Sequence, residues 1–203
     1  VIAKTSGGFM DKIAPLYEDR ESFQRRATRL DYQEEFQRVI RKLEGRGVLI
    51  NKEILDLSET SMAPQTYQLI LHLWALEAII DRVLAHELAP MTIEHTPLSA
   101  TGQPLTPVKG AAISIADPQA YLLSADAPGP YLLEFPVRLR VQGTIDKLHG
   151  FLQAAPSGDR FLTVTGLEVT KPLPGRHQQQ ELLEINLECS CFYLMAGENA
   201  VPL

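Results

Sequence analysis

The feature that most constrains this chain is a strand–helix–strand order that occurs twice, on either side of a stretch rich in Pro, Gly and Ala. In the second half, four apolar residues alternate with polar ones and predict a half-buried strand: Phe135, Val137, Leu139 and Val141. Thr144 is placed to cap a helix after it. Residues 159–172 and 180–195 predict two more strands.

The first half repeats this order with a more apolar helix. We expect a strand at Ile54–Ser58, a helix from about Pro64 through the run QTYQLILHLWALEAIIDRVLAHEL, and a short strand through Ile93. A helix this apolar must pack on a sheet. The sequence therefore predicts an α+β fold, with a ferredoxin-like sheet carrying helices on one face and an amphipathic helical segment before it.

The expected organisation is one domain in two halves, consistent with 203 residues. The parts are N-terminal helices at 1–46 (a stalk, or helices packed on the domain), a first half at 47–98, a linker at 99–130, a second half at 131–195, and a tail at 196–203. A connection as long as 99–130 is uncommon inside a compact domain unless it is functional or a linker.

Two details of the second half are also predicted. Pro136 lies inside a strand pattern, and because proline lacks an N–H it suggests a sheet edge or a bulge. The following helix is expected to bury four residues: Ile145, Leu148, Phe151 and Leu152.

The N-terminal segment carries a narrow apolar stripe in a highly charged surround, formed by Phe23, Leu30, Phe36, Ile40 and Leu43. Asp31, with Glu34 three residues on, predicts the start of a helix, and Gly45 and Gly47 predict its end. These helices either lie on their own domain or form a stalk that meets a partner. The five stripe residues are candidate interface residues.

The last predicted strand adds two interface candidates. Phe192 and Leu194 fall on its outward face, where polar residues are expected, so they are either covered by the N-terminal helices or meet a partner. Arg138 and Arg140 are placed to pair with Glu184 and Glu188 across strands, at a few tenths to about 1 kcal/mol per pair.

Composition excludes several classes of function. A net charge of −6 argues against binding nucleic acid, whose phosphates require a basic surface, and against docking on anionic lipid. No apolar run reaches the roughly 20 residues that span a bilayer. The sequence opens VIAKTSGGFM, without an initiator Met, which is consistent with a processed chain or with one separated from a membrane anchor.

Searches for catalytic and metal-binding patterns yield no candidate residues. His86-Glu87 begins the zinc-protease pattern, but Pro90 stands where its second His is required. Cys189 and Cys191 lack further spaced ligands and are interpreted as reduced core cysteines. We therefore predict no catalytic residues, no metal and no cofactor.

Three segments of the second half together resemble a known family: LEFPVRLRVQGTIDKLHGFLQAA, RFLTVTGLEVTK and LLEINLECSCFYL. They are similar to the C-terminal domain of PilO-type proteins, the inner-membrane alignment-platform components of type IV pili, related in fold to the GspM proteins of type II secretion. The shared pattern is a strand ending in V-x-G, a short helix and a further strand, at Val141–Gly143, Leu148–Leu152 and Val164–Val169. The long linker departs from the family.

The resemblance implies a non-enzymatic scaffold, the periplasmic domain of a membrane-anchored protein in the bacterial envelope. It implies a homodimer, or a heterodimer with a PilN-like or other platform protein, and attachment to the membrane through an N-terminal anchor missing from this chain. Two alternatives stay open: a ferredoxin-like domain that binds a small molecule or regulates, and a cell-surface interaction protein derived from the same pilus scaffold.

Overall fold

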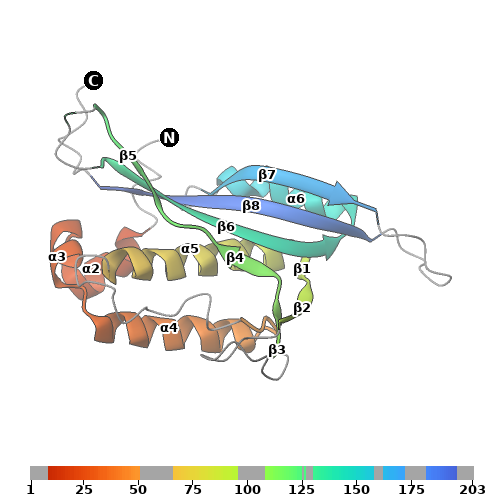
Figure 1. Cartoon of the computed structure of the whole chain (residues 1–203), viewed down its shortest axis with the longest axis horizontal. Helices are drawn as coiled ribbons and strands as arrows, with labels where there is room; N and C mark the ends of the chain where they lie inside the picture. Colours follow the sequence, from red (N-terminus) through yellow and green to blue (C-terminus); the bar gives the residue numbers. More distant parts are fainter. Residues whose placement is uncertain are drawn as a thin grey trace, which may run out of the picture.

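The computed structural model describes residues 9–50, 66–95, 108–124, 126, 130–157, 162–171 and 182–195. It has an antiparallel sheet with helices packed on one face, which confirms the predicted α+β class (Figure 1). We call the sheet face toward the helices the core face, and the opposite one the outer face.

The helices are α2 (Met10–Tyr17), α3 (Arg20–Arg26), α4 (Arg29–Glu44), α5 (Thr66–Ala85), α6 (Ile145–Ala154) and the 3₁₀ turn η3 (Ala155–Ser157). The strands are β1 (Ala89–Pro90), β2 (Thr92–His95), β3 (Val108–Ala111), β4 (Ile113–Ile115), β5 (Gln119–Tyr121), β6 (Leu132–Gly143), β7 (Leu162–Thr170) and β8 (Leu183–Leu194). The strand expected at 54–58 lies outside the described residues.

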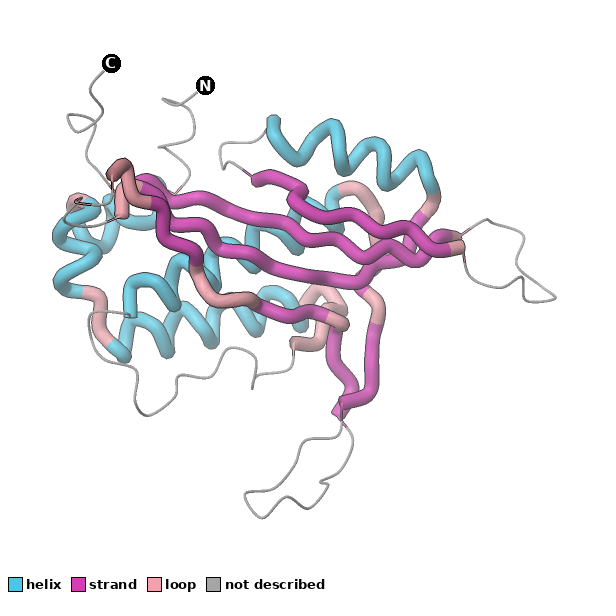
Figure 2. The backbone as a smooth tube through the Cα atoms, turned by 45° about the horizontal axis from the view of Figure 1, so that its top comes forward, coloured by secondary structure: helices cyan, strands magenta, loops and turns pink. Residues whose placement is uncertain are grey.

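Two long strands, β6 and β8, form the centre of the sheet and pair in register from Leu132–Leu194 to Gly143–Leu183. The sheet order is β1-β6-β8-β7, so β8 lies between β6 and β7, which α6 connects in sequence. This is the split β–α–β unit of ferredoxin-like folds. The hairpin of β2 and β3 projects from the sheet (Figure 2).

The linker prediction is wrong for residues 108–121. This stretch contains β3, β4 and β5, and the last two pair with β6 on the side away from β8. Ala111, Ala112 and Ile113 are buried there. Small residues in short strands mimic linker composition, which is why composition alone misassigned them.

Pro136 lies in a central strand and not at an edge, but the pairing beside it is irregular, as the bulge alternative predicted. Three residues separate Ile115 from Gln119, whereas two separate Glu134 from Val137. Its missing N–H falls at a break in the neighbouring strands, because β4 ends at Ile115, opposite Val137, and β5 begins at Gln119, opposite Glu134. The Pro136 carbonyl still accepts a hydrogen bond from the Ala116 N–H, at 3.3 Å. A ladder interrupted at one residue therefore accommodates proline without losing a hydrogen bond.

Helix α5 is buried on nearly every side, because the sheet covers one face and α4 covers the other (Figure 1). Its Trp74 ring stacks on Phe23 of α3 at 5.6 Å, and its His72 ring meets Phe135 of β6 at 5.2 Å. A helix that is apolar all round must be enclosed in this way. Among the described helices, none combines the length and apolarity needed to cross a membrane.

The cap of α4 differs by three residues from the prediction. Thr28, not Asp31, is the N-cap, and Asp31 is the third helical residue, whose carboxylate accepts a hydrogen bond from the Thr28 N–H at 2.7 Å. Asp31 thus belongs to the capping box as its closing carboxylate. At the other end, Gly45 is the C-cap and Gly47 adopts φ +80°, as the two glycines predicted.

Helix α6 begins at the predicted cap, where the Thr144 hydroxyl accepts from the Lys147 N–H at 3.5 Å. Leu148 and Phe151 are buried as expected, and Leu152 is half-buried. The prediction for Ile145 is wrong, because its side chain is 61% exposed. The helix starts directly after β6 ends, so its first turn lies at the rim of the sheet.

Candidate functional site

The outer face of the sheet carries a row of polar and small residues across four strands. Ser114 of β4 lies opposite Arg138 of β6, which lies opposite Glu188 of β8, which lies opposite Gly166 of β7. The row arises from strand alternation, because successive side chains point to opposite faces. Close packing also favours glycine in this row, since a Cβ on residue 166 would lie 3.1 Å from the Glu188 Cβ.

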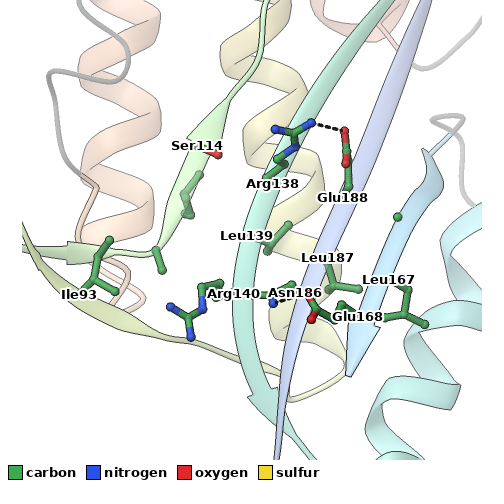
Figure 3. A pocket seen from close by; sticks show the side chains of 13 residues that line it. Ile93, Ser114, Arg138, Leu139, Arg140, Leu167, Glu168, Asn186, Leu187 and Glu188 are labelled. Carbon is green, nitrogen blue, oxygen red and sulfur yellow. Dashed lines mark hydrogen bonds and ion pairs between the residues drawn. The ribbon is translucent and has the colours of Figure 1, made fainter. Parts of the chain in front are cut away.

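An open groove of about 510 Å³ lies over this face (Figure 3). Ile93 of the projecting hairpin and Ser114 border one side, β6 and β8 form the floor, and Leu167 and Glu168 border the other side. The Arg140 guanidinium reaches toward Ile93. The groove therefore crosses β4, β6, β8 and β7.

The charged groups of the groove bond to one another. Arg138 donates to Glu188 at 3.2 Å, Arg140 donates to Glu184 at 3.4 Å, and the Asn186 amide donates to Glu168 at 3.1 Å. Both predicted cross-strand ion pairs are thus confirmed. Within the described residues, no three His, Cys, Asp or Glu side chains gather where they could hold a metal ion. The groove therefore offers an extended polar surface that another molecule can contact.

The outer edge of β7 borders this face. β7 pairs with β8 along one edge, and in the part of the chain that the structure describes no strand pairs with its other edge. Leu167 and Val169 are 45% and 43% exposed, although by register they belong to the core face beside Leu187 and Ile185. The edge is thus both unpaired and apolar.

At the far end of the outer face, a buried carboxylate holds β5 on the sheet. Glu134 of β6 accepts hydrogen bonds from the Tyr121 hydroxyl and from Ser190, the latter at 2.5 Å. The hydrogen bond to Glu134 raises the pKa of Tyr121, because losing the proton would leave two anions in contact. These contacts fix the strand and keep Glu134 away from solvent.

A second charged cluster lies between α5 and the N-terminal helices. The Glu77 side chain is only 4% exposed, and it accepts from Lys12 at 2.5 Å, from Arg38 at 2.9 Å and from Lys42 at 2.8 Å. Arg38 also binds Glu35, whose carboxylate accepts from the Trp74 indole N–H at 2.7 Å. We call these residues the Glu77 cluster; it ties α2 and α4 to α5.

Electrostatics explain why Glu77 stays charged. Burial alone would raise its pKa, but hydrogen bonds from Arg38, Lys12 and Lys42 outweigh burial and hold the pKa of Glu77 far below its ordinary value. The same hydrogen bond to Glu77 raises the pKa of Arg38. Glu77 and Arg38 thus remain ionised at physiological pH.

The seven predicted interface residues do not form one surface. Phe23, Ile40 and Leu43 are almost fully buried within this chain, against α5 and its neighbours. Leu30 is 63% exposed at the start of α4, and Phe36 is half-buried beside Tyr32 at 6.0 Å. The described helices of segment 1–46 therefore pack on the domain, and only part of the stripe can reach a partner.

Phe192 and Leu194 are half-buried at the end of β8. Phe192 lies opposite Glu134 on the outer face, and the Leu194 carbonyl accepts from Arg20 of α3 at 3.2 Å. The N-terminal helices thus reach this end of the sheet, yet both side chains keep some exposure. They remain predicted contact residues.

Sequence reasoning missed the Glu77 cluster and the β7 edge. The signal for the first was present, because Glu77 is a lone carboxylate within the apolar run LILHLWALEAII. A charged residue in such a run is rarely buried without partners. No comparable signal marks β7, because its edge position depends on sheet order.

A scan against known protein families gives no match. A search of curated proteins gives none either.

Solved structures give matches of low sequence identity. The core domain of a protein from Akkermansia muciniphila aligns with a TM-score of 0.49 at 12% identity, covering 96% of this chain and 98% of that one. A protein from the same organism, solved without its transmembrane region, gives 0.48 at 9% identity, covering 95% and 99%. The type 4 fimbrial biogenesis protein PilO from Pseudomonas aeruginosa gives 0.37 at 16% identity, covering 59% and 65%.

Proposed function

We propose that this chain is a non-enzymatic scaffold, a PilO-like component of a type IV pilus or a related secretion machine, which acts by pairing with other proteins. The observation that carries the proposal is the β6–α6–β7–β8 unit. The segments that resemble PilO-type proteins form this unit, and it ends in an apolar strand edge with which no described strand pairs. An edge of this kind is a ready template for pairing with another chain.

The resemblance supports a position of this protein on the periplasmic side of a bacterial membrane, as in the membrane-anchored proteins of the PilO type. Its partners would be PilN-like and other platform proteins. The outer face supports a contact role as well, because its groove presents ion pairs that are exposed on an open sheet. We propose that Leu30, Phe36, Phe192 and Leu194 contribute further contacts.

Affinity capture tests this proposal. The tagged chain, incubated with detergent-solubilised membranes of its own organism, is expected to retain pilus or secretion-platform proteins identified by mass spectrometry. Retention of soluble metabolic proteins alone would overturn the scaffold assignment.

A matched pair of variants sharpens the test. Leu30 and Leu16 are 63% and 64% exposed on N-terminal helices, but only Leu30 belongs to the predicted interface stripe. We expect Leu30→Glu to lower the recovery of platform proteins and Leu16→Glu to leave it unchanged. Equal recovery from both variants would remove Leu30 from the contact surface.

A further inference from the structure

The outer face of the sheet carries opposite charges at the two ends of one cross-strand row. Arg140 of β6 lies opposite Asn186 of β8, and Asn186 lies opposite Glu168 of β7. We call these three residues the Arg140–Glu168 row, and all three line the groove (Figure 3). Neighbouring strands are about 4.8 Å apart, so about 10 Å separates the basic end of the row from the acidic end. The row is therefore a bipolar surface.

Both charged ends of the row keep hydrogen-bonding capacity. The Arg140 side chain is 48% exposed and donates to Glu184, although a guanidinium has five N–H donors. Glu168 is exposed, and one of its carboxylate oxygens accepts from the Asn186 amide. Within the part of the chain that the structure describes, each end is held by this single hydrogen bond. A ligand can therefore contact both charged groups without disturbing the fold.

The neighbours of the row admit the backbone of a ligand. Gly166 lies in the next row of β7, two residues before Glu168, and has no side chain to raise the floor of the groove. At the basic end, Ile93 of the projecting hairpin is 42% exposed, and the Arg140 guanidinium reaches toward it (Figure 3). The groove thus combines a charged contact at each end with an apolar contact beside the basic one.

The separation of about 10 Å selects the conformation of the ligand. In a β-strand, residues on one face are two or four positions apart, which is about 6.6 or 13 Å. In a polyproline II helix, residues three positions apart share a face and lie about 9.3 Å apart, which matches the row. An α-helix would use residues seven apart, but its diameter of about 10–12 Å exceeds the roughly 6.6 Å between neighbouring rows. Polyproline II also leaves its backbone solvated, as an open groove permits.

We propose that the groove binds a linear peptide segment of a partner protein, which lies across the strands in the polyproline II conformation. An acidic residue of the segment contacts Arg140, and a basic residue three positions away contacts Glu168. An apolar residue beside the acidic one contacts Ile93. This inference rests on the proposed scaffold function and defines the chemistry of one class of partner. Such a segment loses little conformational entropy on binding, because polyproline II is preformed in the free peptide.

Selection from a display library of randomised peptides, each about twelve residues long, tests the proposal. Peptides enriched on the purified chain are expected to carry an acidic and a basic residue three positions apart, with proline close to them. The absence of any enriched motif would overturn the proposal. Enrichment of charged residues seven positions apart would overturn it as well, because that spacing indicates a helical ligand.

Charge variants at the two ends of the row should change the selected motif. On Arg140→Glu both ends are acidic, so two basic residues three positions apart are expected, and Glu168→Lys should select two acidic residues. Lys109→Glu is the matched control, because Lys109 and Glu94 form an exposed ion pair at 3.4 Å outside the groove lining. All three substituted positions are exposed, so the fold is retained. Selection of the same peptides by all three variants would overturn the proposal.

Titration by fluorescence anisotropy measures the contact directly. A peptide enriched on the unmodified chain should bind Glu168→Lys at least about 10-fold more weakly, because like charges then meet. Replacing the basic residue of the peptide with glutamate should restore binding to this variant, and failure to restore it would contradict the contact with Glu168.

The groove proposal and the scaffold proposal fail separately. If no peptide motif is enriched but the unmodified chain retains platform proteins, the groove proposal is wrong and the scaffold function stands. If the expected motif is enriched but no platform protein is retained, the scaffold function alone is wrong.

Discussion

The α4–α5 interface and the outer face of the sheet use the same pairs of residue types in opposite ways. At the interface, one buried carboxylate, Glu77, accepts from three cations at 2.5–2.9 Å. On the outer face, Arg138 and Arg140 each meet one glutamate at 3.2–3.4 Å, and their side chains are largely exposed. In both regions opposite charges are in contact, but only at the α4–α5 interface is the carboxylate buried.

The difference indicates what each region does. A buried carboxylate is costly unless cations and hydrogen bonds surround it, so the Glu77 cluster fixes the N-terminal helices in a single position on α5. Exposed pairs contribute little and can be exchanged for contacts with another molecule. The first region therefore holds the domain together, and the second remains available for binding.

The largest effect on stability is expected at the apolar part of the α4–α5 interface. Ile40→Glu places an unpaired carboxylate against α5, so the free energy of unfolding should fall by about 4 kcal/mol or more. Urea titration followed by circular dichroism measures this loss, and the exposed Leu30→Glu should change stability by less than about 0.5 kcal/mol. If the Ile40→Glu chain folds normally and loses only partner binding, Ile40 is an interface residue and not a core residue.

The second-largest effect on stability is expected from acid, through protonation of His72 of α5. Burial lowers the pKa of His72 to about 4, from an ordinary value of 6.5. Between these values the unfolded chain binds the proton and the folded chain does not, so stability is complete above pH 6.5 and is lost as the pH falls toward 4. The loss should be on the order of 3 kcal/mol.

Urea titrations at several pH values measure this slope. His72→Gln, which keeps a side-chain donor but cannot ionise near neutrality, should flatten the slope between pH 6.5 and 4. An unchanged slope would assign the acid sensitivity to other groups. Glu77 acts at lower pH, because its pKa is held below 4.5 and its contribution is lost only as the pH falls below that value.

Removing the charge of Glu77 should cost somewhat less. Glu77→Gln keeps the shape but removes the buried anion that Lys12, Arg38 and Lys42 share, at about 2–3 kcal/mol after allowing for the partial exposure of the cations. Asp81→Asn is the control, because Asp81 shares Lys42 but is more exposed, and it should cost less than about 1 kcal/mol. Equal losses in denaturant titration would mean that burial does not distinguish the two carboxylates.

The smallest effect is expected on the outer face. Glu188→Gln breaks the contact with Arg138 and should change the free energy of unfolding by less than about 0.5 kcal/mol, a change that salt screens. Denaturant titration at low and at high ionic strength measures it. A loss near that of Glu77→Gln would show that the outer pairs also hold the fold.

The sequence predicted the elements whose pattern is local. Alternation located β6 and β8 with their core faces, and the Thr144 cap located α6. The charge pairs of Arg138 and Arg140 also followed, because strand register places them opposite glutamates.

Features that depend on long-range contacts could not be predicted from local sequence patterns. β4 and β5 are only three residues long each and are held in place by pairing with β6, so the stretch that contains them resembled a linker in composition. The partners of Glu77 come from α2 and α4, 35 to 65 positions away in the chain. The apolar stripe of α4 gave no sign of which side faces α5, so Ile40 and Leu30 were grouped although one is buried and the other exposed.

Cys189 and Cys191 lie side by side on the core face of β8, fully buried. Burial raises the pKa of the Cys189 thiol to about 12, so almost none of it is the reactive thiolate at neutral pH. Alkylation of these thiols must therefore wait until the central strand separates from its neighbours. The rate of their modification thus records how often the whole domain opens, and a partner that binds the native fold would slow it.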